Sequence, residues 1–318
     1  MLEPSTILMF LGFGIAAYSV VGNDSIQTLG TFIASNQTVK WYYQWLFAAS
    51  ILVVVLIISF VAFGGDISYG RLEKIPFEKT QWYHLAAPFA LLVLTRLGIP
   101  VSTSLLVLSA FSSSVVFSSI LTKSALGYAI AAVVAYALWY LISGWDNKEN
   151  PVAPERERYW RVAQWIGTAF LWSTWVMHDV ANITVFLPRE MSTGMFASVL
   201  LVFVLGLGYM LYRRGGAIQH IVLEKTNTNY LRSATLIDIC YALILLFFIT
   251  LNNIPMSTTW VFLGLLSGRE LAIATKTAHY KFKNVFPIVG KDILRLLFGL
   301  AVSIAVALLV QSVTQGNV

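Results

Sequence analysis

Long apolar runs separated by short polar segments organise the whole chain. About 20 apolar residues suffice for a helix to cross the hydrocarbon core of a membrane, and many of these runs approach or exceed that length. We expect spans at 6–35, 42–64, 84–98, 102–120 and 125–144 in the first half, and at 160–188, 192–212, 234–251, 252–271 and 291–310 in the second.

Polar residues interrupt several of these runs. Asn23-Asp24 lies inside the first run and His178-Asp179 inside the run at 160–188, so we expect both helices to be broken near the middle of the membrane. Pro100 follows the third run, and proline disfavours helix continuation. We therefore expect 84–98 and 102–120 to form the two arms of a hairpin.

The composition supports a membrane protein. Hydrophobic residues make up 58% of the chain and charged residues 11%, with a mean hydropathy of +0.74. Soluble domains carry about 25% charged residues. The net charge of +6 comes largely from Lys and Arg in short loops, so we interpret it as a signal of membrane topology and expect no nucleic-acid partner.

Two polar motifs each occur twice at the same spacing. Asp24 precedes the Pro100–Ser104 stretch by as many residues as Asp179 precedes the Pro255–Thr259 stretch. One shift along the chain therefore aligns both motifs of one half with both motifs of the other. We infer an internal duplication, with domains at 1–144, 145–159 and 160–318, of which the middle one is a charged cytoplasmic linker.

The number of spans fixes the relative orientation of the two repeats. With about five spans each, an odd number, the repeats would lie in opposite orientations in the membrane. Lys and Arg gather near Lys40, in 145–159, in 213–233 and in 273–291, which predicts that these regions are cytoplasmic. The predicted fold is thus an all-α, multi-pass protein of the inner or plasma membrane. Its two inverted repeats meet at the midplane through broken helices and hairpins, and both termini lie on the non-cytoplasmic side.

Inverted repeats with paired broken helices are typical of secondary transporters, whose sites lie near the midplane. Carboxylates such as Asp24 and Asp179 offer oxygen ligands to a small cation, and hydroxyls after a proline offer hydrogen bonds to an anion. Such hydroxyls also simply cap helices or join helix pairs. Their occurrence in two aligned copies, each with an aspartate, favours a site.

These motifs resemble those of the inorganic phosphate transporter (PiT) family. In that family Asn-Asp-x-Ala-Asn is followed by Pro-x-Ser-Thr-Thr-His in each inverted half, and the resemblance extends over nearly the full chain. The matching positions are Asn23, Asp24, Pro100, Ser102, Thr103, His178, Asp179, Ala181, Asn182, Pro255, Ser257, Thr258 and Thr259. The resemblance implies a symporter that takes up phosphate with Na⁺ or H⁺ by alternating access.

The resemblance also implies the residues of the site. The expected substrate-binding residues are Asn23, Asp24, Gln27, Ser102, Thr103, Ser104, His178, Asp179, Asn182, Ser257, Thr258 and Thr259, to which Arg96 is added as a guanidinium suited to an oxyanion. If sodium is the coupling ion, it would lie at Asn23, Asp24, Asp179 and Asn182. No other cofactor and no catalytic residue is expected, and a homodimer is left open.

Departures from the family pattern fall within the site itself. Gln27 and His178 stand where asparagine is expected, Ser104 stands for threonine, and Leu105 and Trp260 stand for the family histidines. The substrate is therefore phosphate or another oxyanion such as sulfate. A channel or sensor on the same scaffold is a further alternative. An intramembrane hydrolase is disfavoured, because the motifs of serine and zinc hydrolases are absent from the sequence.

Other polar residues in the apolar runs allow a functional and a structural interpretation. His178 either faces the anion and titrates, so that replacement by Asn flattens the pH dependence of uptake, or is hydrogen-bonded to Asp179. Arg96 either binds the anion or reaches the lipid headgroups. We expect Asp238 and His84 near an interface, and Arg269 with Glu270 as a local pair.

Overall fold

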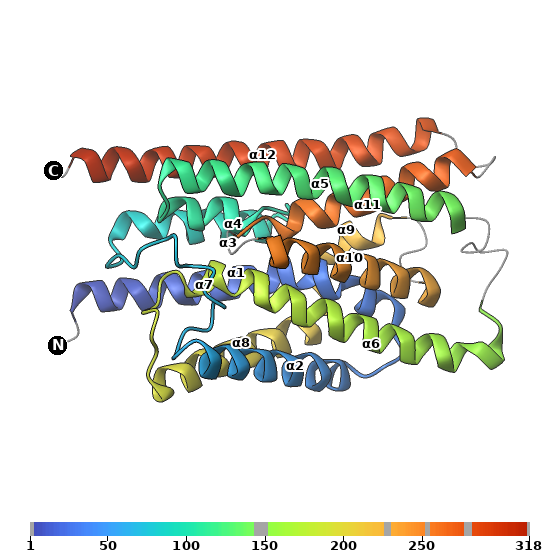
Figure 1. Cartoon of the computed structure of the whole chain (residues 1–318), viewed down its shortest axis with the longest axis horizontal. Coiled ribbons are helices and arrows are strands. Elements are labelled where there is room, and N and C mark those ends of the chain that lie inside the picture. The colour runs from blue at the N-terminus through green and yellow to red at the C-terminus, as the bar shows by residue number, and fades with distance from the viewer. Residues whose placement is uncertain (1–2, 143–151, 226–229, 252–254, 277–281, 317–318) are drawn as a thin grey trace.

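The computed structural model describes residues 3–142, 152–225, 230–251, 255–276 and 282–316 of the chain. Within these ranges the secondary structure is helical, and both ends of the chain lie at the same end of an elongated bundle (Figure 1). The first half contains α1 (Pro4–Ser35), α2 (Trp41–Ala62), η1 (Trp82–Leu85), α3 (Ala86–Arg96), α4 (Thr103–Leu106), η2 (Leu108–Ala110) and α5 (Ser114–Ile142). The second half contains α6 (Pro154–Asp179), α7 (Ala181–Thr184), α8 (Thr193–Tyr212), α9 (Gln219–Leu223), α10 (Leu231–Leu251), α11 (Thr258–Lys276) and α12 (Phe282–Gly316).

The bundle is that of an integral, multi-pass membrane protein. In the described part of the chain, six helices are long and apolar enough to cross a membrane: α1, α2, α5, α8, α10 and the 285–314 part of α12. Their outer faces carry large apolar side chains that stay exposed, such as Val61, Leu141 and Leu294. Such a surface is suited to lipid, and the expected all-α, multi-pass class is confirmed.

The first helix is not broken, contrary to the expectation from Gly22-Asn23-Asp24. α1 runs without interruption from Pro4 to Ser35. Gly22 serves close packing instead, because a Cβ atom there would lie 2.5 Å from the Met210 side chain of α8. The polar residues that follow are satisfied by side-chain hydrogen bonds without any opening of the helix, so the carboxyl of Asp24 projects from an intact helix.

The separate span expected at 102–120 is wrong, and the span expected at 125–144 begins earlier than expected. The second arm of the hairpin consists only of α4 and η2, and α5 then runs without a break from Ser114 to Ile142. Serines do not interrupt α5, because their hydroxyls return to the helix: Ser119 and Ser124 donate to the carbonyls of Val115 and Ile120, four residues back.

The second half follows the expected plan more closely. Val180 separates α6 from α7 at the expected position, although its own backbone angles stay helical. Residues 143–151 of the expected linker, as well as 252–254 and 277–281, lie outside the described residues, and Pro154 already begins α6. α12 is longer than the span expected at 291–310. The domain boundary stays a prediction.

Two hairpins approach the centre of the bundle from different ends (Figure 1). α3 and α4 lie toward the end that holds the two termini, whereas α10 and α11 extend toward the opposite end. An inverted duplication would give this arrangement, although the duplication itself stays a prediction.

Close packing between α5 and α11 fixes the second hairpin. Gly264 and Gly268 of α11 face the α5 backbone, where an added Cβ would lie 2.4 Å from the carbonyl oxygen of Tyr128 and 2.0 Å from that of Ala132. Small residues spaced four apart allow membrane helices to approach this closely. The contact holds the start of α11 against α5, where the backbone N–H of Ser257 donates to Ser124 Oγ (2.8 Å).

Candidate functional site

Two buried carboxylates near the centre of the bundle are each bonded to a threonine of a hairpin. The hydroxyl of Thr103 donates to Asp24 Oδ2, and the hydroxyl of Thr258 donates to Asp179 Oδ2. In both pairs the threonine lies 79 positions after the aspartate. All four residues are at most 3% exposed. The equal spacing in the sequence therefore corresponds to an equal contact in space.

Three amide side chains complete this cluster. Asn23 Nδ2 donates to Asp24 Oδ1 (2.9 Å) and to the carbonyl of Val101 (2.8 Å). Gln27 Nε2 donates to Asn23 Oδ1 (3.0 Å). Asn182 Nδ2 joins the two halves, because it donates to Asp179 Oδ1 and to Thr103 Oγ1, both at 2.8 Å.

A reciprocal pair of hydrogen bonds joins the tips of the two hairpins. Ser104 Oγ donates to the carbonyl of Met256 (2.8 Å), and Thr259 Oγ1 donates to the carbonyl of Val101 (3.2 Å). Thr259 Oγ1 also lies 3.5 Å from Asp24 Oδ1. These bonds satisfy carbonyls that lie just before the first turns of α4 and α11, and they bring the residues of the four expected motifs into one cluster.

Ser102 and Ser257 occupy helix N-caps, as expected. Ser102 Oγ accepts a hydrogen bond from the N–H of Leu105 (3.1 Å), and Ser257 Oγ accepts one from the N–H of Trp260 (3.2 Å). A hydroxyl that accepts in this way still has its own hydrogen to donate. The two caps therefore combine a structural role with a donor on each side of the cluster.

His178 faces an arginine rather than Asp179. Arg71 Nη2 lies 2.9 Å from His178 Nδ1, and His178 Nε2 lies 3.0 Å from the carbonyl oxygen of Leu245. Since a guanidinium only donates, Nδ1 must accept and Nε2 must carry the hydrogen. This pair of contacts fits the neutral ring and leaves no nitrogen of His178 for a proton from solution.

Sequence reasoning placed Arg71 in a polar loop and missed its contact with the cluster. Arg71 follows Gly70, and several residues of the 63–71 segment, including Gly70, have positive φ angles. Arg71 is only 3% exposed. Lys123 of α5 is also buried, at 8% exposure. A cationic residue in an otherwise polar loop gives no signal of burial, so only the tertiary structure reveals it.

Arg96 does not join the cluster. Its side chain is exposed, and its guanidinium lies 5.3 Å from the centre of the Tyr18 ring. The expected role in anion binding is therefore not supported by its position. His84, expected near an interface, is 2% exposed and stacks on Phe111 with 4.4 Å between the ring centres.

The oxygens of the cluster fit a small cation. Gln27 Oε1 and Asn182 Oδ1 are buried acceptors without a hydrogen-bond partner among the described residues, close to the carboxylates of Asp24 and Asp179. Buried amide oxygens seldom lack a donor, and hard cations take oxygen ligands of this kind. No group of three His, Cys, Asp or Glu side chains that suits a transition metal lies in the described ranges.

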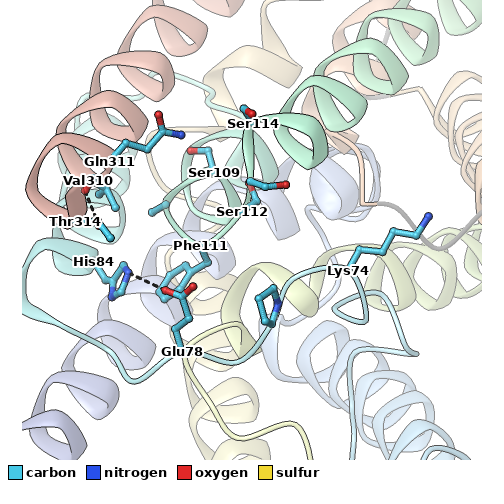
Figure 2. A pocket seen from close by; sticks show the side chains of 13 residues that line it. Lys74, Glu78, His84, Ser109, Phe111, Ser112, Ser114, Val310, Gln311 and Thr314 are labelled. Carbon is cyan, nitrogen blue, oxygen red and sulfur yellow. Dashed lines mark hydrogen bonds and ion pairs between the residues drawn. The ribbon is translucent and has the colours of Figure 1, made fainter. Parts of the chain in front are cut away.

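A cleft of about 460 Å³ lies near the end of the bundle that holds the termini. In Figure 2, His84 lies beside Thr314 of α12 with Gln311 above it, Glu78 lies below, and Lys74 lies on the far side. Hydroxyls of the segment that joins the first hairpin to α5 also line it, namely Ser109, Ser112, Ser113 and Ser114. Because Ser109 follows α4 directly, the cleft extends from outside toward the first hairpin.

A solved structure described as "The sodium-dependent phosphate transporter" has the same fold. The superposition gives a TM-score of 0.67 and covers 99% of this chain and 100% of the other, at 17% sequence identity. No protein-family model matches the chain, and no curated protein matches it. The likeness therefore concerns the fold, which is that of a phosphate-transporter-like membrane protein.

Proposed function

We propose, with this shared fold as the premise, that the protein is an ion-coupled carrier of a small inorganic oxyanion, with phosphate as the first candidate. The observation that carries the proposal is the central cluster. It contains two carboxylates, two amide oxygens without a hydrogen-bond partner among the described residues, and paired hydroxyls. The carboxylates and amides come from α1 in the first half and from α6 and α7 in the second, and the hydroxyls come from the tip of one hairpin in each half.

The carboxylates and amide oxygens are assigned to the cation. Asp24, Asp179, Gln27 and Asn182 together present more acceptor than donor groups, which is costly in a membrane interior unless a cation is bound. The hydroxyls of Thr103 and Thr258 now bond to the carboxylates, and rotation about one side-chain bond would turn their oxygens toward an ion. Sodium fits this set of ligands.

The anion is assigned to the hydroxyls of the hairpin tips. Ser102 and Ser257 accept hydrogen bonds from backbone N–H groups, so their own hydrogens can be donated to an oxyanion. A bound cation would offset the negative charge of the two aspartates and so permit an anion next to them. Coupling follows from this, because neither ion binds well without the other.

Access to the cluster would alternate between the two ends of the bundle. The first hairpin separates it from the cleft lined by Ser109 and His84, and the second hairpin lies toward the opposite end. If one hairpin moved at a time, the cluster would open to one end of the bundle only. The hydrogen bonds of Ser104 and Thr259, which join the tips of the two hairpins, would break in this movement.

Uptake into proteoliposomes tests the proposal. Purified protein is reconstituted, and labelled phosphate and labelled sulfate are supplied with an inward sodium gradient, a pH gradient or neither. A carrier accumulates one of these anions above its outside concentration only when a coupling gradient is present, and it also catalyses exchange at equilibrium. Equal fluxes with and without gradients, which never exceed equilibration, indicate a channel, and no flux above protein-free vesicles contradicts the proposal.

A further inference from the structure

Asp238 is a buried carboxyl that belongs to neither copy of the duplicated motifs. It was expected near an interface, but it is 0% exposed and lies between three helices, on α10 facing α1 and α6. Thr31 Oγ1 of α1 lies 2.5 Å from Asp238 Oδ1, and Thr168 Oγ1 of α6 lies 2.5 Å from Asp238 Oδ2. Each carboxyl oxygen thus has one hydroxyl partner.

No cationic side chain balances this carboxyl. Among the residues that the structure describes, Asp238 forms hydrogen bonds only with these two threonines and takes part in no ion pair. The elements packed around α10 are α1, α5, α6 and α11. Their buried ionisable side chains, with those of α10 itself, are Asp24, Lys123, His178, Asp179, Arg269, Glu270, Arg232, Cys240 and Tyr241.

Those neighbouring groups have interactions of their own. Asp24 and Asp179 are bonded to Thr103 and Thr258, and Arg269 is paired with Glu270 at 3.0 Å, as expected from the sequence. A carboxylate without a counter-charge in a membrane interior is strongly destabilised. The carboxyl must therefore hold either a proton or a small cation.

The direct contacts favour a proton over a metal ion. Each carboxyl oxygen is already hydrogen-bonded to a threonine hydroxyl, so a metal ion between the carboxyl and the hydroxyls would have to separate these oxygens, whereas a proton needs no such movement. A threonine hydroxyl can donate to the ionised carboxylate or accept from the protonated acid, so the two hydroxyls accommodate both states by rotation alone.

We propose that Asp238, held between Thr31 and Thr168, is a proton-binding site that is loaded and unloaded during transport; this rests on the proposed function. Polar side chains connect it with the end of α1, where Gln164 bonds to Ser35 and Arg161 donates to the carbonyl of Ser35 (2.9 Å). That route offers water access to the threonines when the helices part.

α10 connects this site with the central cluster. Tyr241, one turn after Asp238, donates its hydroxyl to the carbonyl of Thr258 (2.9 Å), and the Thr258 side chain bonds to Asp179. A change of charge at Asp238 that shifts α10 therefore reaches the second hairpin directly. The site would thus drive anion accumulation with a pH gradient, whether or not sodium also binds at the centre.

Asp238→Asn tests this proposal, with Glu190→Gln, at an exposed carboxylate in the loop between α7 and α8, as the control. The probe is labelled inorganic phosphate in proteoliposomes. Asparagine mimics the permanently neutral carboxyl, so we expect the variant to exchange phosphate at equal pH at the wild-type rate while it loses accumulation driven by a pH gradient. The control variant should keep both. The proposal is overturned if Asp238→Asn accumulates phosphate in a pH gradient as the wild type does. It is also overturned if phosphate accumulation by the wild type depends on the sodium gradient alone.

A second measurement does not depend on transport. One component of the infrared carbonyl band of protonated buried carboxyls should appear and disappear with pH in the purified wild type and be missing from Asp238→Asn, which keeps only the components of the other buried carboxyls, such as Asp24 and Asp179. An identical band in both proteins overturns the proton site. If the wild type shows this band but transports neither phosphate nor sulfate, the proposed function is contradicted, whereas the proton-binding site at Asp238 is retained.

Discussion

The surroundings of Asp24 and Asp179 agree in one respect and differ in another. Each carboxyl accepts a hydrogen bond from a threonine 79 positions later in the chain. Beside Asp24 stands Asn23, which donates to that carboxyl and to the Val101 carbonyl. Beside Asp179 stands His178, which is turned away toward Arg71.

We interpret this difference between the surroundings of Asp24 and Asp179 as a sign that the cluster has two separate roles. The oxygens that could hold a cation are equivalent in the two halves, since Gln27 and Asn182 occupy matching motif positions and each has a buried oxygen without a partner. The charge environment is not equivalent, because only the Asp179 side has a buried arginine nearby. We infer that the shared geometry serves ion binding and that the unshared Arg71 tunes the charge of one side.

The largest effect is expected from replacing either carboxyl. Asp24→Asn and Asp179→Asn each remove one negative charge from the proposed cation site, so net uptake should fall to the level of protein-free vesicles. Because a buried charge is removed, the protein should still fold and insert. Uptake and monodispersity in detergent are the measurements. If one variant keeps wild-type uptake and ion dependence, its carboxyl is structural and the two sides are not equivalent.

A large effect on folding is expected at the α5–α11 crossing, which has no counterpart in the four-residue α4. Gly268→Ala would put a methyl group 2.0 Å from the Ala132 carbonyl oxygen, and such overpacking costs about 1–3 kcal/mol or more. The midpoint of thermal unfolding in detergent should fall. Gly14→Ala, where no atom lies within 4 Å, is the control. Equal midpoints for both variants would show that the helices adjust freely.

A moderate and equal effect is expected from the two threonines. Thr103→Val and Thr258→Val leave a buried carboxyl without its hydroxyl, at a cost of about 1–3 kcal/mol. Apparent affinity for the coupling ion should weaken by roughly tenfold or more in both, since about 1.4 kcal/mol corresponds to a factor of ten. The ion dependence of uptake gives this value. A loss confined to one variant would break the equivalence of the two sides.

The smallest effect is expected at His178. Both ring nitrogens are engaged, by Arg71 and by the carbonyl of Leu245, in the pattern of a neutral ring. His178→Asn should therefore change the apparent affinity modestly and leave the shape of the pH profile of uptake unchanged between pH values of about 5.5 and 7.5. A profile that flattens in the variant would mean that His178 does titrate during transport, which is one of the two interpretations that the sequence left open.

The membrane class and the main polar motifs could be predicted because they depend on local pattern. Apolar runs of sufficient length gave the confirmed all-helical class, and equal spacing brought Asp24, Thr103, Asp179 and Thr258 together as expected. The break expected in α1 was wrong, because the sequence does not show that Gly22 packs on Met210 and that the neighbouring polar groups find partners across the bundle.

Contacts between distant segments could not be predicted. Arg71 lies in a loop and Asp238 near the start of an apolar run, and neither position reveals that its side chain is buried. Serines within 102–120 suggested a separate span, whereas Ser119 lies inside one long α5 and its hydroxyl bonds to the carbonyl of Val115. Whether the gathered residues bind ions stays a prediction.

Equilibrium binding of labelled phosphate to the purified protein tests the central claim most directly. It is measured with and without sodium and at two pH values, for the wild type, Asp24→Asn, Asp179→Asn and the exposed loop control Glu190→Gln, with sulfate as competitor. A single oxyanion site at the cluster predicts saturable binding that depends on a coupling cation, is retained by the control and is lost in both cluster variants. Saturable binding retained unchanged in both cluster variants would contradict the claim.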